Sequence, residues 1–249
     1  MDLQSKLAKY SPISLKDMDE VSLTNRIDTK YVFHVDHLFD VLDSLTDDYS
    51  ILSLEGLRSH LYETLYFDDK DLSLYLNHHN QRGSRYKLRL RKYGSSDVSF
   101  MEVKKKTNTG RTIKARKKTQ EFNEELSPTQ LDFFKMETGE ASGNWLCSSS
   151  ITFNRITLVS LDPPERMTLD LNLKFSDPHT NVLFDNIIVA EVKQGSKAPS
   201  AFIRAMKKRR IHSSSISKYC LGLSLLRPSL KQNLFKSQQR LIKNIQNIA

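Results

Sequence analysis

The feature that most constrains the fold of this chain is a set of strand-like segments in which charged and apolar residues alternate. The clearest of them reads Lys-Leu-Arg-Leu-Arg and occupies residues 87–91. Because side chains of a β-strand point alternately to opposite faces, Lys87, Arg89 and Arg91 share one face and the two leucines share the other. In a half-exposed antiparallel sheet, such a charged face would lie in water. A sheet that closes with its charges inward would instead form a basic tunnel that binds a polyanion.

The same alternation recurs in three later segments, at residues 101–104, 166–173 and 190–193. The predicted polar face carries Glu102, Lys104, Arg166, Thr168, Asp170, Asn172, Glu191 and Lys193. The predicted apolar face carries Met101, Val103, Met167, Leu169, Leu171, Leu173, Ala190 and Val192. Like charges opposite each other on neighbouring strands are destabilising, so a face rich in Arg and Lys needs an anionic ligand to offset the repulsion. Unpaired charges are also costly in a dry interior, so the lumen must be wet or filled with ligand.

The composition favours an ordinary globular fold and an anionic partner. The chain has 249 residues, with 38 Lys and Arg against 29 Asp and Glu, and a formal net charge of +9. Nucleic acid, an anionic membrane surface and phosphate compounds are all compatible with this charge. The length suits one large β domain or two small domains. Because no linker rich in Gly or Ser is visible, we expect a single domain over residues 1–249.

The sequence also indicates a compartment. The first residues lack the basic and then apolar layout of a signal peptide, and no apolar run approaches the ~20 residues of a membrane span. Cys147 and Cys220 are too few, and too unpatterned, for a disulfide scaffold or a zinc site. We therefore expect a cytoplasmic location in a reducing compartment.

The pattern of residues predicts about eight strands, the number at which a closed barrel has only a narrow interior. We expect them at residues 26–33, 60–68, 84–93, 98–106, 112–118, 151–159, 165–175 and 183–193. Helices are expected at residues 36–45, 128–137, 198–211 and 230–248, and the last of these is amphipathic. The predicted fold class is α+β: an eight-stranded antiparallel β tunnel barrel over about residues 24–223, with helices packed outside.

The motifs of these strands, taken in order, resemble one known family. Residues 25–31 read Asn-Arg-Ile-Asp-Thr-Lys-Tyr, residues 65–68 Leu-Tyr-Phe-Asp, residues 87–94 Lys-Leu-Arg-Leu-Arg-Lys-Tyr-Gly and residues 100–104 Phe-Met-Glu-Val-Lys. Later segments follow in the same order: Phe-Asn-Arg at 153–155, Arg-Met-Thr-Leu-Asp at 166–170, Ala-Glu-Val-Lys at 190–193 and Ser-Lys-Tyr at 217–219. From about residue 26 to 223 the chain resembles the VTC-type polyphosphate polymerase domain, of the triphosphate tunnel metalloenzyme superfamily.

The resemblance implies a fold, a reaction and a set of site residues. In that family an eight-stranded barrel binds the triphosphate of ATP with inward Lys and Arg, and the terminal phosphoryl group passes to a growing polyphosphate chain. The implied catalytic residues are Lys30, Arg89, Arg91, Lys104, Lys114, Arg155, Arg166 and Lys218. We expect three further cations to line the site: Arg26, Lys87 and Lys193.

The resemblance also implies a divalent metal, which we expect to be Mn²⁺, with Mg²⁺ as the alternative. Glu191 is similar to the metal-binding glutamate, although it could instead form a same-face ion pair with Lys193. Glu102 is either a second metal ligand or an ion-pair partner of a neighbouring lysine. One position departs from the eukaryotic pattern, which has a further lysine three residues before Lys218, where this chain has Ser215. That departure puts processivity in doubt more than the fold.

Other functions are compatible with the same residues. In a triphosphatase of this fold, inorganic or nucleoside, water would replace phosphate as the acceptor. A non-catalytic polyphosphate-binding subunit could lose the metal carboxylate, so the presence of Glu191 favours catalysis. Nucleic acid is not an expected partner, because no stacking-platform signature is visible. The expected partners are ATP, polyphosphate or triphosphate, and a membrane protein that receives the polymer at the inner face of a membrane.

Overall fold

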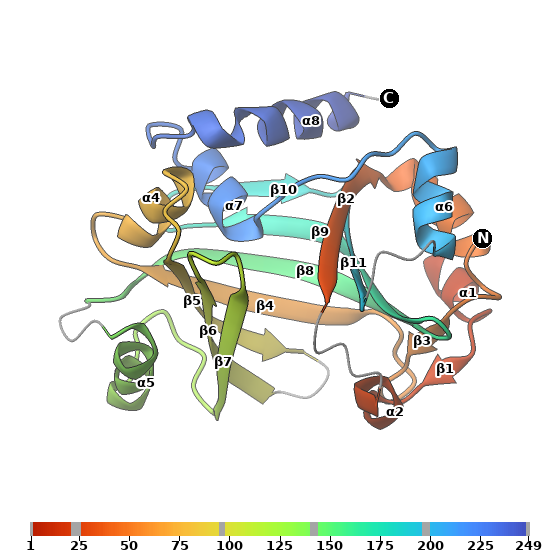
Figure 1. The fold of residues 1–249 in the computed structure, drawn as a ribbon, viewed down its shortest axis with the longest axis horizontal. Helices are drawn as coiled ribbons and strands as arrows, with labels where there is room; N and C mark the ends of the chain where they lie inside the picture. Colours follow the sequence, from red (N-terminus) through yellow and green to blue (C-terminus); the bar gives the residue numbers. More distant parts are fainter. Residues whose placement is uncertain (1, 21–25, 95–97, 140–143, 196–199, 248–249) are drawn as a thin grey trace.

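A computed structural model of the chain describes residues 2–20, 26–94, 98–139, 144–195 and 200–247. Its centre is a large sheet whose long strands all pair antiparallel with their neighbours (Figure 1). In spatial order these strands are β2 (Ile27–His34), β11 (Ile187–Gln194), β9 (Pro164–Ser176), β8 (Leu146–Leu161), β4 (His60–Asp68), β5 (Arg85–Tyr93), β6 (Val98–Lys106) and β7 (Thr112–Thr119).

Three short strands extend this sheet. β1 (Pro12–Ile13) pairs in parallel with β3 (Ser50–Leu52), which in turn pairs with β8. β10 (Asn181–Phe184) pairs with β9. The antiparallel sheet of the predicted α+β class is therefore confirmed. The strand predicted at residues 183–193 is instead two, because a bend at residues 185–186 separates β10 from β11.

Helices pack around the sheet, and their bounds are as follows: α1 (Leu3–Leu7), α2 (Leu15–Glu20), η1 (Val35–His37), α3 (Leu38–Asp43), α4 (Ser73–His79), α5 (Pro128–Thr138), α6 (Ala201–Lys208), α7 (Lys218–Leu226), η2 (Asn233–Phe235) and α8 (Lys236–Gln246). The four predicted helices correspond to η1 with α3, to α5, to α6 and to η2 with α8. Residues 24, 25, 198, 199 and 248, which fall in predicted elements, lie outside the described residues.

Among the helices that follow β2, two, α4 and α7, have no counterpart in the predicted ones. α4 begins beside the carboxylate of Asp68, which accepts hydrogen bonds from the backbone N–H groups of Leu74 and Tyr75 at 2.9 Å. α7 is apolar on nearly all sides, and its residues are mostly buried. A short helix of this kind has no polar stripe, so the 3.6-residue periodicity that identifies surface helices is missing from its sequence.

The two faces of the sheet differ in chemistry. The outer face carries the predicted apolar residues and is covered by α1, α3 and α6 on one part and by α5 on another (Figure 1). The inner face, which we define by Lys30, Arg89, Glu102, Arg155 and Glu191, carries most of the predicted charges. Glu102 is fully buried there and Arg89 is 7% exposed. The charged face of the sheet is thus turned toward the interior of the molecule.

One part of the inner face is apolar, because α7 packs on it. Phe153 of β8 and Leu173 and Phe175 of β9 belong to the same buried cluster as Tyr219 and Leu223 of α7. The predicted alternation along β9 is wrong beyond Leu171. Asn172 has a positive φ of 53° at an irregularity in the pairing with β8, and this places Leu173 in a different cluster from Leu169.

The two ends of the strand order, β2 and β7, do not pair with each other in the part of the chain that the structure describes. The segment before α7 lies along the free edge of β2 instead: Tyr31 forms an isolated bridge with Ser213, and the N–H of Ser214 donates to the carbonyl of Lys30 at 2.8 Å. Among the described residues, no helix is long and apolar enough to cross a membrane.

Candidate functional site

Strand register aligns charged residues of β5, β6 and β7 in two rows across the inner face. Lys87, Lys104 and Lys114 are aligned in one row. In the next row, Glu102 lies between Arg89 and Arg116. The face therefore presents a line of three lysines beside a line in which one acid separates two arginines.

Glu102 is tightly held by its cationic neighbours. Its carboxylate accepts from Nε of Arg89 at 2.6 Å and lies 2.5 Å from Nζ of Lys114 and 3.7 Å from Nε of Arg116. Burial alone would raise the pKa of Glu102, but the nearby charges of Arg89, Arg91 and Lys114 outweigh it and hold that pKa well below its ordinary value. Glu102 was expected to be either a second metal ligand or the ion-pair partner of a neighbouring lysine, and the geometry shows the ion pair.

Asp170 is the second tightly held acid. Arg155 on β8 donates to it in bidentate fashion, with Nε at 2.6 Å and Nη2 at 2.8 Å. Lys218 donates to the same carboxylate from the first turn of α7. Burial would raise the pKa of Asp170, yet the charges of Arg155 and Lys218 keep it well below its ordinary value. Asp170 thereby fixes the start of α7 to the inner face.

Glu191 differs from both of these acids because its contacts are long and its side chain is 21% exposed. Its carboxylate lies 3.9 Å from Nζ of Lys30 and 4.0 Å from Nζ of Lys193, and it accepts no hydrogen bond from any described residue. Although burial acts in the opposite direction, the charges of Lys193 and Lys30 lower the pKa of Glu191 to about 2. Glu191 is thus ionised at neutral pH, and its oxygens are open to a further ligand.

Besides Lys87, two cations on the inner face have no carboxylate within ion-pair distance among the described residues. Arg91 is 7% exposed and donates through Nε to the hydroxyl of Thr64 at 3.2 Å. Lys104 lies between the other two lysines of its row, and the charge of Arg89, together with burial, places its pKa well below the ordinary value. Both side chains are positioned to gain strongly from a bound anion.

Three of the predicted cations make contacts outside the two rows. Lys87 donates to the hydroxyl of Ser217 at 2.9 Å, and burial lowers its pKa. Arg166 is turned away toward α2, where its Nη2 donates to the carbonyl of Met18 at 2.7 Å. Arg26 is exposed and pairs with Asp28 at 3.1 Å. The structure therefore brings most of the predicted residues together, but it does not bring Arg26 or Arg166 to the centre.

Three further residues belong to the site but were not among the predicted ones. Arg116 is in the row of Glu102, and its place on β7, two residues after Lys114, is a signal that the alternation already contained. The hydroxyl of Tyr66 accepts from Nη1 of Arg89 at 3.4 Å. Ser217 is the N-cap of α7, and its hydroxyl accepts a hydrogen bond from Nζ of Lys87. Neither of the last two could be found from its spacing in the sequence.

The donor set for a divalent metal is small. In the described part of the chain, no group of three or more His, Cys, Asp or Glu side chains is placed to hold a metal ion. Glu102 and Asp170 are occupied by cations, which leaves Glu191 as the carboxylate with free oxygens. Hard divalent ions such as Mg²⁺ often bind through one or two carboxylates, with water and substrate phosphates completing the shell. The residues present fit such a metal, with Glu191 as its protein ligand.

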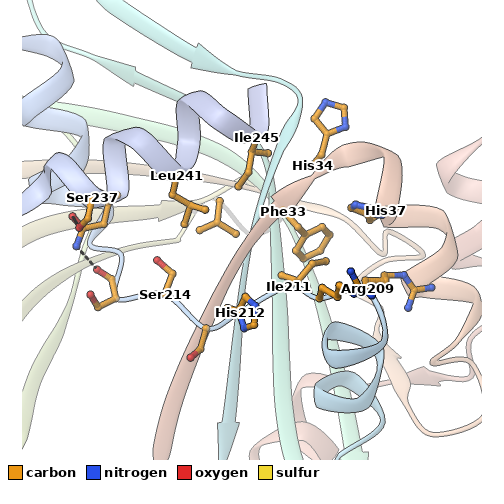
Figure 2. Close-up of a pocket in the computed structure, with 15 residues that line it drawn as sticks. Phe33, His34, His37, Arg209, Ile211, His212, Ser214, Ser237, Leu241 and Ile245 are labelled. Carbon is orange, nitrogen blue, oxygen red and sulfur yellow. Dashed lines mark hydrogen bonds between the residues drawn. The ribbon is translucent and has the colours of Figure 1, made fainter. Parts of the chain in front are cut away.

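A separate groove of about 390 Å³ lies beside the free edge of β2, between the segment at residues 209–215 and α8 (Figure 2). Its lining includes the apolar residues Phe33, Ile211 and Leu241 and the polar residues His34 and Arg209. Nζ of Lys30 and the carboxylate of Glu191 are not part of its lining. This groove is thus distinct from the basic inner face.

Comparisons with known proteins bear on the family and the fold of this chain. The sequence model of the VTC domain matches residues 25–227, whereas no curated protein matches the chain. Among solved structures, the fold is similar to a proposed adenylyl cyclase from Hippeastrum described as having a dominant triphosphatase activity, with 16% identity, a TM-score of 0.51, and coverage of 81% of this chain and 97% of that one.

A proposed adenylate cyclase from Bacillus halodurans is also similar, at 14% identity and a TM-score of 0.47, covering 78% of this chain and 96% of that one. A protein of Pyrococcus horikoshii matches at 10% identity and a TM-score of 0.44, over 80% of this chain and 99% of that one. At these identities the likeness to solved structures concerns the fold alone. The match to the VTC domain covers most of the chain, and the chain therefore belongs to the VTC-domain family.

Proposed function

We propose that this protein is a metal-dependent polyphosphate polymerase that transfers the terminal phosphoryl group of ATP to a polyphosphate chain, with ADP as the other product. The observation that carries the proposal is the excess of cations over carboxylates on the inner face. Lys87, Lys104 and Lys114 stand side by side, and Arg91, two residues beyond Arg89 on β5, has no carboxylate within ion-pair distance among the described residues. Such a face is unfavourable when empty and favourable when a polyanion fills it.

The chain's own residues supply what phosphoryl transfer requires, which is positioning and neutralisation of charge. Arg91 presents a planar guanidinium for bidentate contact with phosphate oxygens, and the lysine row presents point charges. Glu102 and Asp170 hold Arg89, Arg155 and Lys218 in place. Glu191 would hold a divalent ion together with phosphate oxygens, and that ion would supply further neutralisation of the charge on the transferred group. No protein nucleophile is needed if the acceptor phosphate attacks directly.

A second candidate function is a triphosphatase, in which water attacks the terminal phosphate. α7 and its apolar contacts cover one part of the inner face, and this arrangement favours a reaction that does not pass a long chain across the whole face. The same basic rows would serve both reactions. A third possibility is a non-catalytic subunit, which would bind polyphosphate but catalyse neither reaction.

The test uses the purified protein with ATP and Mn²⁺, with products resolved on a polyphosphate gel and free phosphate measured in the same sample. Long chains support the polymerase, and release of free phosphate alone supports the triphosphatase. Absence of both products, together with tight binding of polyphosphate, would refute catalysis by this chain.

A matched pair of variants tests the role of the lysine row. Lys104→Met should weaken substrate binding strongly, because Lys104 lies on the inner face. Lys105→Met is the control, since Lys105 is the next residue on β6 and lies over the ring of Tyr86, at 5.2 Å from its centre. Equal effects of the two substitutions would contradict the assignment of the lysine row to substrate binding.

A further inference from the structure

Aromatic side chains gather on the inner face where the basic rows end. The ring centre of Tyr62 on β4 lies 4.9 Å from that of Tyr93 on β5, and Tyr93 lies 5.8 Å from Phe100 on β6. Tyr62 also stacks on the buried ring of Phe153 at 5.4 Å. Tyr93 and Phe100 are only half-buried, and neither belongs to a hydrophobic cluster of the described residues. Core packing therefore does not account for these two rings.

Cations lie against the same aromatic rings. The guanidinium of Arg116 is 3.4 Å from the ring centre of Phe100 and 5.5 Å from that of Tyr93, and its Nη2 donates to the hydroxyl of Tyr93 at 3.2 Å. The guanidinium of Arg91 is 5.6 Å from the ring centre of Tyr62. Aromatic rings and arginine planes are the two protein surfaces on which nucleobases stack. The end of the basic rows thus has the chemistry of a base-stacking site.

The position of the aromatic group along β5 also fits a nucleotide. Lys87, Arg89, Arg91 and Tyr93 share the inner face, and the strand rises about 3.4 Å per residue, so Tyr93 lies about 7 Å beyond Arg91. At the other end of this series, Lys87 contacts Ser217 at the start of α7. A triphosphate bound along this series, across the basic rows from Lys87 to Arg91, would therefore have one end toward α7 and the other end toward the aromatic rings.

We propose that Tyr93, Phe100 and Arg116 form a nucleobase subsite, so that the protein takes a nucleoside triphosphate with its base on these residues and its terminal phosphate toward the lysine row. The subsite rests on the proposed function, because the same basic face holds the triphosphate. Recognition is by stacking, which every base can provide, so the subsite favours nucleoside triphosphates over inorganic triphosphate more than it distinguishes one base from another.

The test compares the affinities for ATP and for inorganic tripolyphosphate, measured by calorimetry without divalent metal so that neither ligand turns over. Tyr93→Leu removes the aromatic face and keeps an apolar side chain. We expect this substitution to weaken ATP binding about tenfold, the range of one lost stacking contact, and to change tripolyphosphate binding less than about twofold. Tyr93→Phe should bind both ligands like the wild type.

Tyr86→Leu is the matched control, because it removes an aromatic ring from the same strand on the outer face, where Tyr86 packs beside the cluster under α5. It should leave both affinities unchanged. Phe100→Leu provides a second variant if Tyr93→Leu fails to fold, as judged by thermal unfolding. Equal loss of affinity for both ligands, or no loss for either, would overturn the subsite.

This design separates the two proposals. If the wild type forms neither polyphosphate nor free phosphate, the proposed function fails, but the binding comparison still decides whether the rings recognise a base. If the wild type is active and the variants bind ATP and tripolyphosphate in the wild-type ratio, the subsite fails and the proposed function stands.

Discussion

Replacing Glu102 with Gln keeps the shape of the side chain but removes the negative charge that Arg89 and Lys114 share in a fully buried position. Removing one partner of a buried ion pair costs about 3–5 kcal/mol, because the remaining charges stay buried and uncompensated. For a chain of this size, each kcal/mol shifts Tm by about 2–4 °C. We therefore expect Glu102→Gln to lower Tm by about 6–20 °C in a thermal unfolding experiment.

Glu191→Gln is the matched comparison on the same face. Its contacts to Lys30 and Lys193 are 3.9 and 4.0 Å long, so the ion pairs contribute less than about 1 kcal/mol to stability. We expect Tm within about 4 °C of the wild type, together with loss of turnover measured by the polyphosphate gel and phosphate release. A larger loss of Tm in Glu191→Gln than in Glu102→Gln would refute this division between a structural acid and a metal ligand.

The pH dependence of Tm checks the same reasoning through the charge of Glu102. Its carboxyl has a pKa well below the ordinary value of 4.5 in the folded protein, since the charges of Arg89 and Arg91 outweigh the effect of burial. The unfolded chain therefore takes up this proton first as the pH falls, and the stability contribution of Glu102, complete above about pH 5, declines below it. The Tm difference between wild type and Glu102→Gln should shrink as the pH is lowered from 5 to 3. A constant difference would show that the charge does not cause the stabilisation.

Two other perturbations test the lysine row and α7. Arg89 and burial lower the pKa of Lys104 in the free protein, and a bound anion raises it. Across an alkaline pH series, binding of inorganic tripolyphosphate should therefore take up more protons in the wild type than in Lys104→Met, as measured by calorimetry in buffers of different ionisation enthalpy. Equal uptake by the two proteins at every pH would contradict the assignment. In α7, a Cβ at position 222 would lie 2.3 Å from Cδ1 of Phe175. Gly222→Ala should therefore destabilise the fold by about 1–3 kcal/mol through overpacking and lower Tm by about 2–12 °C. A wild-type Tm in this variant would show that α7 is not tightly packed there.

The strands and their faces could be read from the sequence because strand side chains alternate with a period of two whatever the rest of the fold. Residues 87–91 illustrate this, since Arg89 and Arg91 do lie on the inner face and the two leucines are buried on the outer face. The alternation stopped being a guide at Asn172, where an irregularity in the pairing moves Leu173 to the other side. A single residue with positive φ leaves no signal in a pattern of polar and apolar residues.

The sequence could not predict which side chains would meet across neighbouring strands and helices. Arg166 has the same alternating context as Asp170, yet it ends on the carbonyl of Met18 because α2 lies near it. Glu102 and Glu191 also look alike as acids within Glu-X-Lys motifs. Register separates them: Glu102 is enclosed between Arg89 and Arg116, whereas Glu191 meets Lys30 and Thr168 and keeps free oxygens.

By itself, the sequence determined the long strands, the charge of one sheet face and the resemblance to the VTC domain, because all three depend on residue order and local periodicity. The tertiary structure decided which acids are neutralised, where α7 covers the inner face, and which aromatic rings stand at the end of the basic rows. Those outcomes depend on strand register and helix packing, which join residues far apart in the chain. Arg155, Asp170 and Lys218 show the reason: their ion pairs exist only once β8, β9 and α7 are packed together.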